Sequence, residues 1–156
     1  MSEYTVRSIT ADEVTPLRVA LVHRHDRSAP ASYPADDHPG TLHAGGFLDD
    51  ALVGIATVHP EAMPGGRPTG SWRIRDLAVD HGHRGRGLGG LLLDRCLEHV
   101  AESEGRVVWC RAPAGTFGFF KRRGFRRHGE PSTSPRGEPE YLLFAEVAPL
   151  DRPWDL

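Results

Sequence analysis

Residues 72–111 carry the pattern that most constrains the fold of this chain. A strand-like run over Trp72–Val79 is followed by five residues and the glycine-rich sequence GRGLGG, and from Leu88 apolar residues recur at helical spacing. The main apolar stripe comprises Leu88, Leu92, Cys96 and Val100, widened by Leu91, Leu93 and Leu97. Gly105 is expected to end this helix at its C′ position, and Val107–Cys110 then resembles a short buried strand. The segment therefore predicts a strand–helix–strand unit with parallel strands.

The remaining sequence alternates short strand and helix signals. Thr10 is an N-cap candidate for a helix through about His23, with Pro16 in its first turn, and Arg24–Gly40 is expected to be a substrate-side loop. Asp49-Asp50 separates two strand-like runs and predicts a hairpin. The expected strands outside the central unit are Tyr4–Ile9, Thr41–Leu48, Ala51–His59, Phe125–Glu130 and Tyr141–Val147, and a short helix is expected at Phe117–Lys121.

Length and composition indicate one globular domain over residues 1–156. Of the residues, 38% are hydrophobic and 26% are charged, and the net charge of −2 offers no general attraction to nucleic acid or to an anionic membrane. The first ten residues lack an apolar signal region, and no run approaches the length of a membrane span, so a cytoplasmic protein without a membrane or nucleic-acid partner is expected. Cys96 and Cys110 are expected to be buried thiols.

The turn Arg84–Gly90 is the main candidate for ligand binding. A helix that begins directly after glycines exposes its first N–H groups and the positive end of its dipole to an anion. Arg84 and Arg86 add positive charge, and the glycines allow the backbone to approach a phosphate closely. The turn therefore predicts a diphosphate site.

Two other diphosphate motifs fit this turn less well. Gly85, Gly87 and Gly90 have the spacing of a dinucleotide-binding fingerprint, but the turn begins five residues after the strand. Cys110 and Arg111, not an acidic residue, stand at the end of the next strand. A P-loop is excluded because no Gly-Lys-Ser/Thr follows the glycines.

Two spaced motifs resemble the GNAT superfamily of N-acyltransferases. Arg84, Gly87 and Gly89 match Arg/Gln-x-x-Gly-x-Gly/Ala, which follows an apolar-x-Val strand end in that family, here Leu77-Ala78-Val79. Downstream, Phe119–Phe125 resembles the family's second motif, aromatic-Tyr-x-x-x-Gly-Phe. The strong resemblance covers about residues 72–127.

The resemblance implies an α/β (α+β) fold and a coenzyme A site. The fold would be a mixed sheet of about six to seven strands flanked by helices, splayed between the Trp72–Val79 and Val107–Cys110 strands, with acyl-CoA in the gap. The main chain of Leu77 and Val79 would pair with the pantetheine arm. The implied cofactor-binding residues are Leu77, Ala78, Val79, Arg84, Gly85, Arg86, Gly87, Leu88, Gly89, Gly90, Phe117, Phe120 and Arg123.

The catalytic residues are less well indicated. Acyl transfer to an amine requires a neutral nucleophile, an oxyanion donor and an acid for the leaving thiolate. The family's second motif supplies the acid from a tyrosine, but Phe120 stands in its place here. Candidates for proton transfer are Asp76, His59, His81 and the acidic loop Asp36-Asp37-His38. The resemblance implies the Val79 N–H as the oxyanion donor. Alternation along the strand places Arg75 and Asp76 on opposite faces. No metal site is expected, because the histidines lack a paired ligand motif.

The sequence therefore supports one leading function and two alternatives. The leading hypothesis is an N-acyltransferase that moves an acetyl group from acetyl-CoA, its co-substrate, to the amine of a small molecule or peptide. A non-catalytic acyl-CoA-binding or regulatory module is the alternative, because Phe120 replaces the tyrosine. An NADP-binding oxidoreductase is the third hypothesis. The sequence leaves open whether the protein forms a homodimer.

Overall fold

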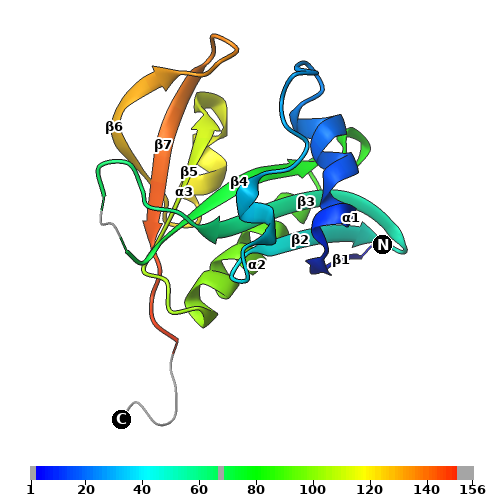
Figure 1. The fold of residues 1–156 in the computed structure, drawn as a ribbon, viewed down its shortest axis with the longest axis horizontal. Coiled ribbons are helices and arrows are strands. Elements are labelled where there is room, and N and C mark those ends of the chain that lie inside the picture. The colour runs from blue at the N-terminus through cyan, green and yellow to red at the C-terminus, as the bar shows by residue number, and fades with distance from the viewer. Residues whose placement is uncertain (1–2, 67–68, 151–156) are drawn as a thin grey trace. The chain divides into compact units, whose positions relative to one another are not determined.

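The structure, a computed structural model, describes residues 3–66 and 69–150 (Figure 1). Its α-helices are α1 (Ala11–Leu17), α2 (Leu88–Glu102) and α3 (Phe117–Lys121). Its strands are β1 (Tyr4–Ile9), β2 (Leu42–Leu48), β3 (Ala51–Pro60), β4 (Ser71–Val79), β5 (Val107–Pro113), β6 (Arg126–Thr133) and β7 (Pro139–Glu146). The strands form one mixed sheet in the order β1-β2-β3-β4-β5-β7-β6. The predicted fold class, a mixed sheet of six to seven strands with flanking helices, is confirmed.

The chain divides into two compact units. The first comprises Met1–His59 and Ile74–His99, and the second comprises Pro60–Arg73 and Val100–Leu156. In the first unit, β1 pairs antiparallel with β2, and β2 pairs antiparallel with β3. Asp49, at the turn between β2 and β3, has a φ of 53°. The predicted Asp49-Asp50 hairpin is therefore confirmed, with aspartate in a backbone conformation that it tolerates better than most residues.

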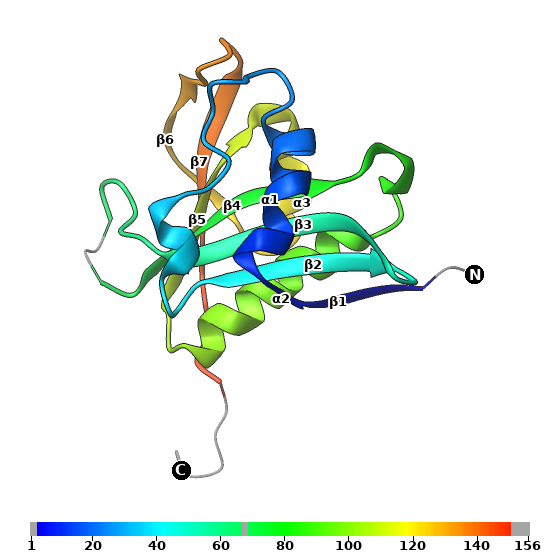
Figure 2. The ribbon, with the colours of Figure 1, turned by 45° about the vertical axis from the view of Figure 1, so that its right-hand side comes forward.

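Helices α1 and α2 cover opposite faces of the sheet in the first unit (Figure 2). On the α1 face, a buried cluster contains Ile9, Val14, Phe47 and Ile55. On the α2 face, Leu88 lies so close to the strands that a Cβ at Gly46 would meet its side chain at 2.6 Å. Gly54 faces the same helix, where a Cβ would lie 3.0 Å from Leu88. The two glycines allow α2, and with it the turn before α2, to lie close to the sheet.

The first helix is shorter than predicted and changes its hydrogen-bonding pattern. The predicted N-cap is confirmed, because the Thr10 hydroxyl accepts from the Glu13 N–H and the Glu13 carboxylate accepts from the Thr10 N–H. The α-helix ends at Leu17, and a π-helical turn continues over Arg18–Val22. Pro16 lies in the second turn of the helix, not in the first as predicted. Because proline lacks the N–H that an interior position uses, the regular pattern is weakened just before the π turn.

The C-terminus of α2 differs from the prediction by one residue. The Glu104 N–H bonds to the Ala101 carbonyl, and the Gly105 N–H bonds to the Val100 carbonyl at 2.8 Å. These bonds place Glu104, with a φ of 62°, at the C′ position and Gly105 one residue later. Gly105 is required for space, since a Cβ there would lie 2.7 Å from the Trp72 ring. The predicted apolar stripe of α2 is buried, except that Leu97 is partly buried and Leu91 is 45% exposed.

The second unit contains β5, β6, β7 and α3. The predicted parallel pair is confirmed over three residue pairs, Ser71–Arg73 with Val107–Trp109. β7 pairs antiparallel with both β5 and β6, which confirms the predicted strand pair at the C-terminus. The Trp109 indole N–H donates to the Glu61 carbonyl at 2.9 Å. The splay between the central strands, which the resemblance implied beyond these pairs, stays a prediction.

The predicted loop Arg24–Gly40 contains one ordered helical turn. A 3₁₀ helix spans Pro34–Asp37, and its first turn carries Asp36, which is buried. The Thr41 hydroxyl donates to the Ala35 carbonyl at 2.6 Å. The second half of this segment is therefore fixed to the first unit by specific hydrogen bonds.

Candidate functional site

The turn that leads into α2 is exposed and has the backbone geometry that an anion site requires. A 3₁₀ turn at His81–His83 precedes it, and Arg84–Gly87 are all exposed. Gly85 and Gly87 have φ values of 74° and 89°, a left-handed region that glycine enters without strain. A Cβ at either position would meet nothing within 4 Å. The Gly87 carbonyl accepts from the Leu91 N–H, so the helix begins directly after this glycine.

The exposed turn is attached firmly at both ends. Arg84 Nε donates to the carbonyl of Val79, the last residue of β4, at 3.0 Å. Tyr4 Oη and His83 Nδ1 are 2.9 Å apart, which connects the turn to β1. Leu88, only 1% exposed, fixes the first residue of α2 in the core. The first N–H groups of a 15-residue helix thus follow a turn whose backbone is held in place and open to solvent.

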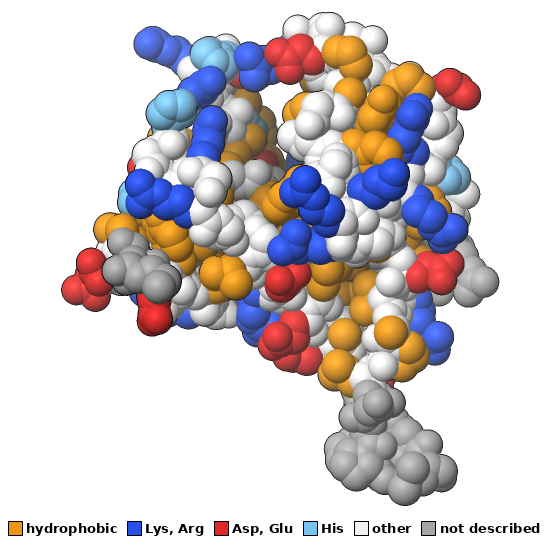
Figure 3. Space-filling model, turned by 180° about the vertical axis from the view of Figure 1, so that it is seen from behind, with side chains coloured by type: hydrophobic (Ala, Val, Ile, Leu, Met, Phe, Trp, Pro, Cys, Tyr) orange, Lys and Arg blue, Asp and Glu red, His pale blue; other side chains and the backbone are white. Residues whose placement is uncertain are grey.

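The positive charge near this turn is local. Figure 3 shows basic, acidic and hydrophobic side chains side by side on the face turned away from the viewer in Figure 1. The chain as a whole carries a net charge of −2. Attraction for a phosphate must therefore come from Arg84, Arg86 and the helix N-terminus and not from the overall field.

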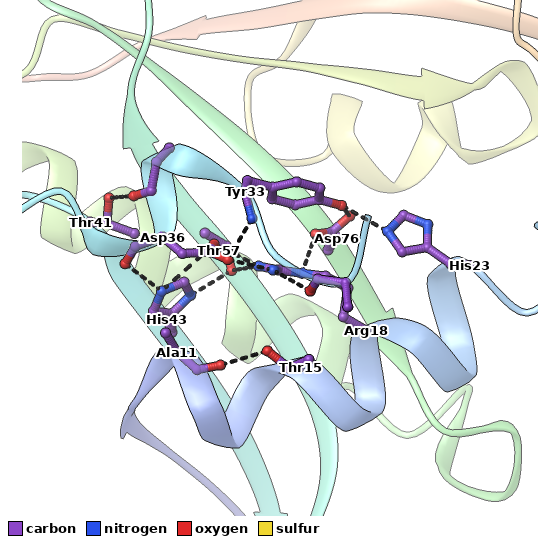
Figure 4. Close-up of polar contacts among 12 residues, drawn as sticks. Ala11, Thr15, Arg18, His23, Tyr33, Asp36, Thr41, His43, Thr57 and Asp76 are labelled. Carbon is purple, nitrogen blue, oxygen red and sulfur yellow. Dashed lines mark hydrogen bonds and ion pairs between the residues drawn. The ribbon is translucent and has the colours of Figure 1, made fainter. Parts of the chain in front are cut away.

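A buried ion-pair cluster lies on the α1 face of the sheet, and Arg18 is its centre (Figure 4). Arg18 binds Asp36 through two hydrogen bonds of 2.7 and 3.0 Å, and its Nε lies 2.8 Å from Asp76 Oδ2. It also donates to Ala31 O at 3.1 Å and to Thr57 Oγ1 at 3.3 Å. The side chains of Arg18, Asp36 and Asp76 are 0%, 3% and 7% exposed. The cluster therefore joins the π-helical turn after α1, the 3₁₀ helix before β2, and strands β3 and β4.

Charge pairing within the cluster shifts the pKa values of its members. Burial alone would raise the pKa of Asp36, but the guanidinium of Arg18 and the Tyr33 N–H together lower it below its usual 3.8. Burial alone would lower the pKa of Arg18, and the two carboxylates raise it instead. His43 also contacts the cluster, because its Nδ1 lies 2.9 Å from Thr57 Oγ1. Both partners of the Arg18–Asp36 pair are thus charged at neutral pH.

Tyr33 connects this cluster to β4. Its hydroxyl donates to Asp76 Oδ1 at 3.2 Å and lies 2.9 Å from His23 Nε2. Burial, and next the negative charge of Asp76, raise the pKa of Tyr33 to about 12. The guanidinium carbons of Arg18 and Arg75 lie 4.2 and 4.0 Å from the centroid of its ring. Tyr33 is therefore a neutral, fixed ring at neutral pH, in contact with two cations.

The backbone of β4 is irregular at Asp76, and this corrects the predicted orientation of the strand. Asp76 has a φ of 59°, an uncommon value for a residue other than glycine. The regular alternation of side chains is interrupted there, as at a bulge. As a result, Arg75 and Asp76 both contact Tyr33, although alternation predicted opposite faces. The prediction was wrong because the alternation rule assumes regular strand dihedrals, and no glycine marks the irregular position.

The structure separates the proton-transfer candidates. In the acidic loop, Asp36 is buried against Arg18, while Asp37 and His38 are exposed. Asp76 lies in the buried cluster, His59 is 1% exposed within β3, and His81 is exposed in the turn after β4. Arg18 and Tyr33, the residues that surround Asp76, were not predicted as site residues. Arg18 is the cationic side chain in the run PLRVAL, where a charge among apolar residues could have indicated a buried pair.

The aromatic residues of the second motif lie in the second unit. Phe120 is 6% exposed and packs against Phe119 and Phe125, with ring centroids 5.1 and 5.3 Å away. Phe117 is partly buried and contacts Tyr141 edge-to-face at 5.8 Å. The guanidinium of Arg123 lies 5.3 Å from the Phe119 ring. Phe120 thus occupies an aromatic core in this unit, and the predicted contacts of Phe117, Phe120 and Arg123 with coenzyme A stay predictions.

The histidine, cysteine and acidic side chains of residues 3–66 and 69–150 form no group of three or more that is placed to hold a metal ion. In the same part of the chain, no helix is long and apolar enough to cross a membrane. Cys96 and Cys110 are both buried free thiols.

Comparison with known proteins identifies the family. A sequence model of the acetyltransferase (GNAT) family matches residues 7–125. An uncharacterised N-acetyltransferase of Bacillus subtilis, YitI, is 28% identical over 130 residues, which is 83% of this chain and 87% of that protein. The chain therefore belongs to the GNAT acetyltransferase family and is an acyl-CoA-dependent N-acetyltransferase. The resemblance drawn from the two motifs is confirmed.

Solved structures share the fold at low sequence identity. Escherichia coli ElaA superimposes with a TM-score of 0.74 at 20% identity, over 94% of this chain and all of that one (100%). An aminoglycoside 6′-N-acetyltransferase, solved in complex with coenzyme A, has a TM-score of 0.72 at 13% identity, over 95% of this chain and 99% of its own. These similarities show the fold.

Proposed function

We propose that this enzyme binds the pyrophosphate of acetyl-CoA at the turn Arg84–Gly90 and transfers the acetyl group to the amine of a small molecule or peptide. The observation that carries this proposal is the fixed, exposed turn before α2, with left-handed glycines at 85 and 87. Such a turn leaves the helix N–H groups and two arginines facing solvent without a Cβ to exclude a phosphate.

The pantetheine arm is proposed to extend from this turn along β4. Main-chain groups of Leu77 and Val79 would bind its amides as an added strand would. Val79 also accepts the hydrogen bond from Arg84, so the end of β4 and the turn have one fixed geometry. The Val79 N–H is proposed as the donor to the developing oxyanion.

The chemistry requires a neutral amine and a path for the leaving thiolate. An alkyl amine with a lysine-like pKa near 10.4 is mostly protonated at neutral pH and must lose a proton before attack. Asp76 lies on β4 itself, but its two oxygens already contact Arg18 and Tyr33. We therefore propose that Asp76 positions Tyr33 and the strand. Phe120 cannot donate a proton, so coenzyme A is proposed to leave as the thiolate.

A thiol-release assay tests this function. The enzyme is incubated with acetyl-CoA and a panel of amines that includes amino acids, polyamines, an aminoglycoside and peptides with free N-termini. Turnover with at least one amine and loss of turnover in Arg84→Glu are expected. Binding of acetyl-CoA without turnover on any amine would support the alternative, a non-catalytic acyl-CoA-binding module.

Other properties predicted from the sequence stay predictions. They are a cytoplasmic location and the absence of nucleic-acid or membrane partners, and the sequence leaves open whether the protein forms a homodimer. Preference for NADP(H) at the same turn is the third hypothesis, and calorimetric titration with NADPH would detect it.

A further inference from the structure

Arg75 is a partly buried arginine on β4 that pairs with no acidic side chain among residues 3–66 and 69–150. Its contact there is the Tyr33 ring, 4.0 Å from the guanidinium carbon. The other inward-facing arginines behave differently. Arg18 pairs with two aspartates, and Arg73 binds Glu61 at 3.0 Å while it lies over Trp109. Arg75 therefore differs from Arg18 and Arg73 in having no carboxylate partner among the described residues.

The stacked guanidinium is fixed in orientation but keeps its donors available. A guanidinium that lies over an aromatic ring uses its planar face for that contact and directs its N–H groups outward. Tyr33 itself is held by hydrogen bonds to Asp76 and His23, so the surface on which Arg75 rests is rigid. The buried polar atoms without a hydrogen-bond partner include none from Arg75 among the described residues. Its donors therefore face space that solvent can enter.

The position of Arg75 on β4 indicates which anion it would meet. Arg75 precedes Leu77 by two residues and Val79 by four, so it lies roughly 7 to 13 Å from them at about 3.3 Å per residue, on the side away from the turn Arg84–Gly90. The phosphates of coenzyme A are proposed at the turn, and the arm is proposed to extend back along the strand. An anion at Arg75 would therefore lie near the acyl end.

We propose that Arg75 is a carboxylate-binding residue next to the reacting acyl group, so that one of the two substrates of this enzyme carries a carboxylate. The inference rests on the proposed placement of acyl-CoA along β4. The carboxylate comes from an acceptor of the amino-acid type or from a dicarboxylic acyl group such as succinyl. In either case the planar guanidinium binds it through two parallel N–H···O bonds.

The irregular backbone at Asp76 supports this assignment. The φ of 59° at Asp76 brings Arg75 and Asp76 to the same side, against Tyr33. An uncommon backbone conformation costs free energy and persists where the surrounding structure requires it. A regular strand would direct Arg75 and Asp76 to opposite faces and would separate one of them from Tyr33. The irregular backbone at Asp76 thus places Arg75 beside the Tyr33 ring.

Two experimental arms distinguish the sources of the carboxylate. The first compares kcat/KM for amino acids with the matching amines that lack the carboxylate: phenylalanine with phenethylamine, lysine with cadaverine and alanine with ethylamine. The second compares the Kd of succinyl-CoA with that of acetyl-CoA by isothermal titration calorimetry, a readout that does not depend on turnover. Each arm is measured for the wild type, Arg75→Met, Tyr33→Phe and Arg7→Met.

The variants separate the role of Arg75 from general effects. Arg7 also lies over an aromatic ring, 4.1 Å from the Phe47 centroid, but its side chain is 59% exposed and pairs with Glu13. Arg7→Met therefore serves as the matched control, because it also removes an arginine that lies over an aromatic ring, at another position in the chain. Tyr33→Phe keeps the ring below Arg75 and removes only the hydroxyl. Circular dichroism confirms that each variant is folded.

The expected result is a preference for the carboxylate-bearing substrate in one arm, about ten- to hundredfold, as hydrogen bonds to charged groups typically provide. The preference should fall to near unity in Arg75→Met, decrease in part in Tyr33→Phe, which removes the hydrogen bonds that hold the ring below Arg75, and persist in Arg7→Met. A wild type without preference in either arm, or an Arg75→Met variant that keeps it, overturns the proposal. If acetyl-CoA binds but no amine turns over, the second arm alone decides. If the wild type does not bind acetyl-CoA, the proposed function itself fails and this inference fails with it.

Discussion

Replacing Arg18 with methionine should destabilise the protein strongly, because it leaves two buried carboxylates without their shared cation. The Arg18 side chain is 0% exposed and that of Asp36 is 3% exposed, so water screens their attraction very little. Removing one partner of a buried ion pair costs about 3–5 kcal/mol. We expect the free energy of unfolding at pH 7.5 to fall by at least about 3 kcal/mol. Methionine replaces the apolar stem of arginine, so the substitution removes chiefly the guanidinium and its charge.

The dependence of this loss on pH tests its electrostatic origin. In the wild type, Arg18 and Tyr33 hold the pKa of Asp36 below 3.8, against the opposing effect of burial, so the stabilisation is present above that pH and is lost as the pH falls through the lowered pKa. Without Arg18, burial should raise the pKa of Asp36 above 3.8. Protonation of Asp36 would then remove its unpaired charge in Arg18→Met. The difference in the free energy of unfolding between the wild type and this variant should therefore shrink from pH 7.5 to pH 4.5.

Urea unfolding followed by far-ultraviolet circular dichroism measures both quantities. Arg7→Met is the control, because the Arg7–Glu13 pair is exposed and 4.0 Å long and should contribute less than about 1 kcal/mol. A deficit below about 1 kcal/mol for Arg18→Met at pH 7.5, or the same deficit at pH 4.5, would refute the reasoning. If Arg18→Met does not fold at pH 7.5, the double variant Arg18→Met/Asp36→Asn should recover folding.

Three further predictions follow from single sites. Gly105→Ala should destabilise by about 1–3 kcal/mol in urea unfolding, because its Cβ would overlap the Trp72 ring, whereas Gly118→Ala, with open space around it, should not destabilise. In a spectrophotometric titration, one tyrosine should ionise near pH 12, and Tyr33→Phe should remove that step. Since the pKa of Tyr33 is raised, its contribution to stability should persist below pH 10 and be lost as the pH rises towards 12; a tyrosine titration complete by pH 11 would contradict this. Burial raises the pKa of Cys96 and of Cys110 to about 12, so a thiol reagent should label both only after unfolding.

The strand–turn–helix core of the fold could be predicted because local rules determine it. The apolar spacing from Leu88 to Val100 requires a helix with one buried face, and the glycines before it require a turn. Thr10 and Glu13 form the capping box that their spacing predicts. In each case the residues that interact lie within four positions of one another. The two family motifs then predicted the coenzyme A site by resemblance, and its residues stay a prediction.

The buried cluster could not be predicted because its members are distant in sequence. Arg18, Asp36 and Asp76 come from three separate segments, and only the folded sheet brings them within 3 Å. The left-handed backbone of Asp76 has no signal of the kind that glycine would supply. The one-residue error at Gly105 has the same cause, since Trp72, far away in sequence, requires the glycine there. Tertiary contacts, not local propensity, decided these positions.

The central claim is that acetyl-CoA binds with its pyrophosphate at the turn before α2. Isothermal titration calorimetry of acetyl-CoA against Gly87→Asp tests it most directly, with Gly137→Asp as the control. Both glycines have left-handed φ values, 89° and 80°, and a Cβ added at either would meet no atom within 4 Å, so the two substitutions impose a similar backbone strain and the same charge. We expect Gly87→Asp to weaken binding at least about a hundredfold, because a carboxylate would face the pyrophosphate, while Gly137→Asp binds like the wild type. Equal affinities in the two folded variants would contradict the claim.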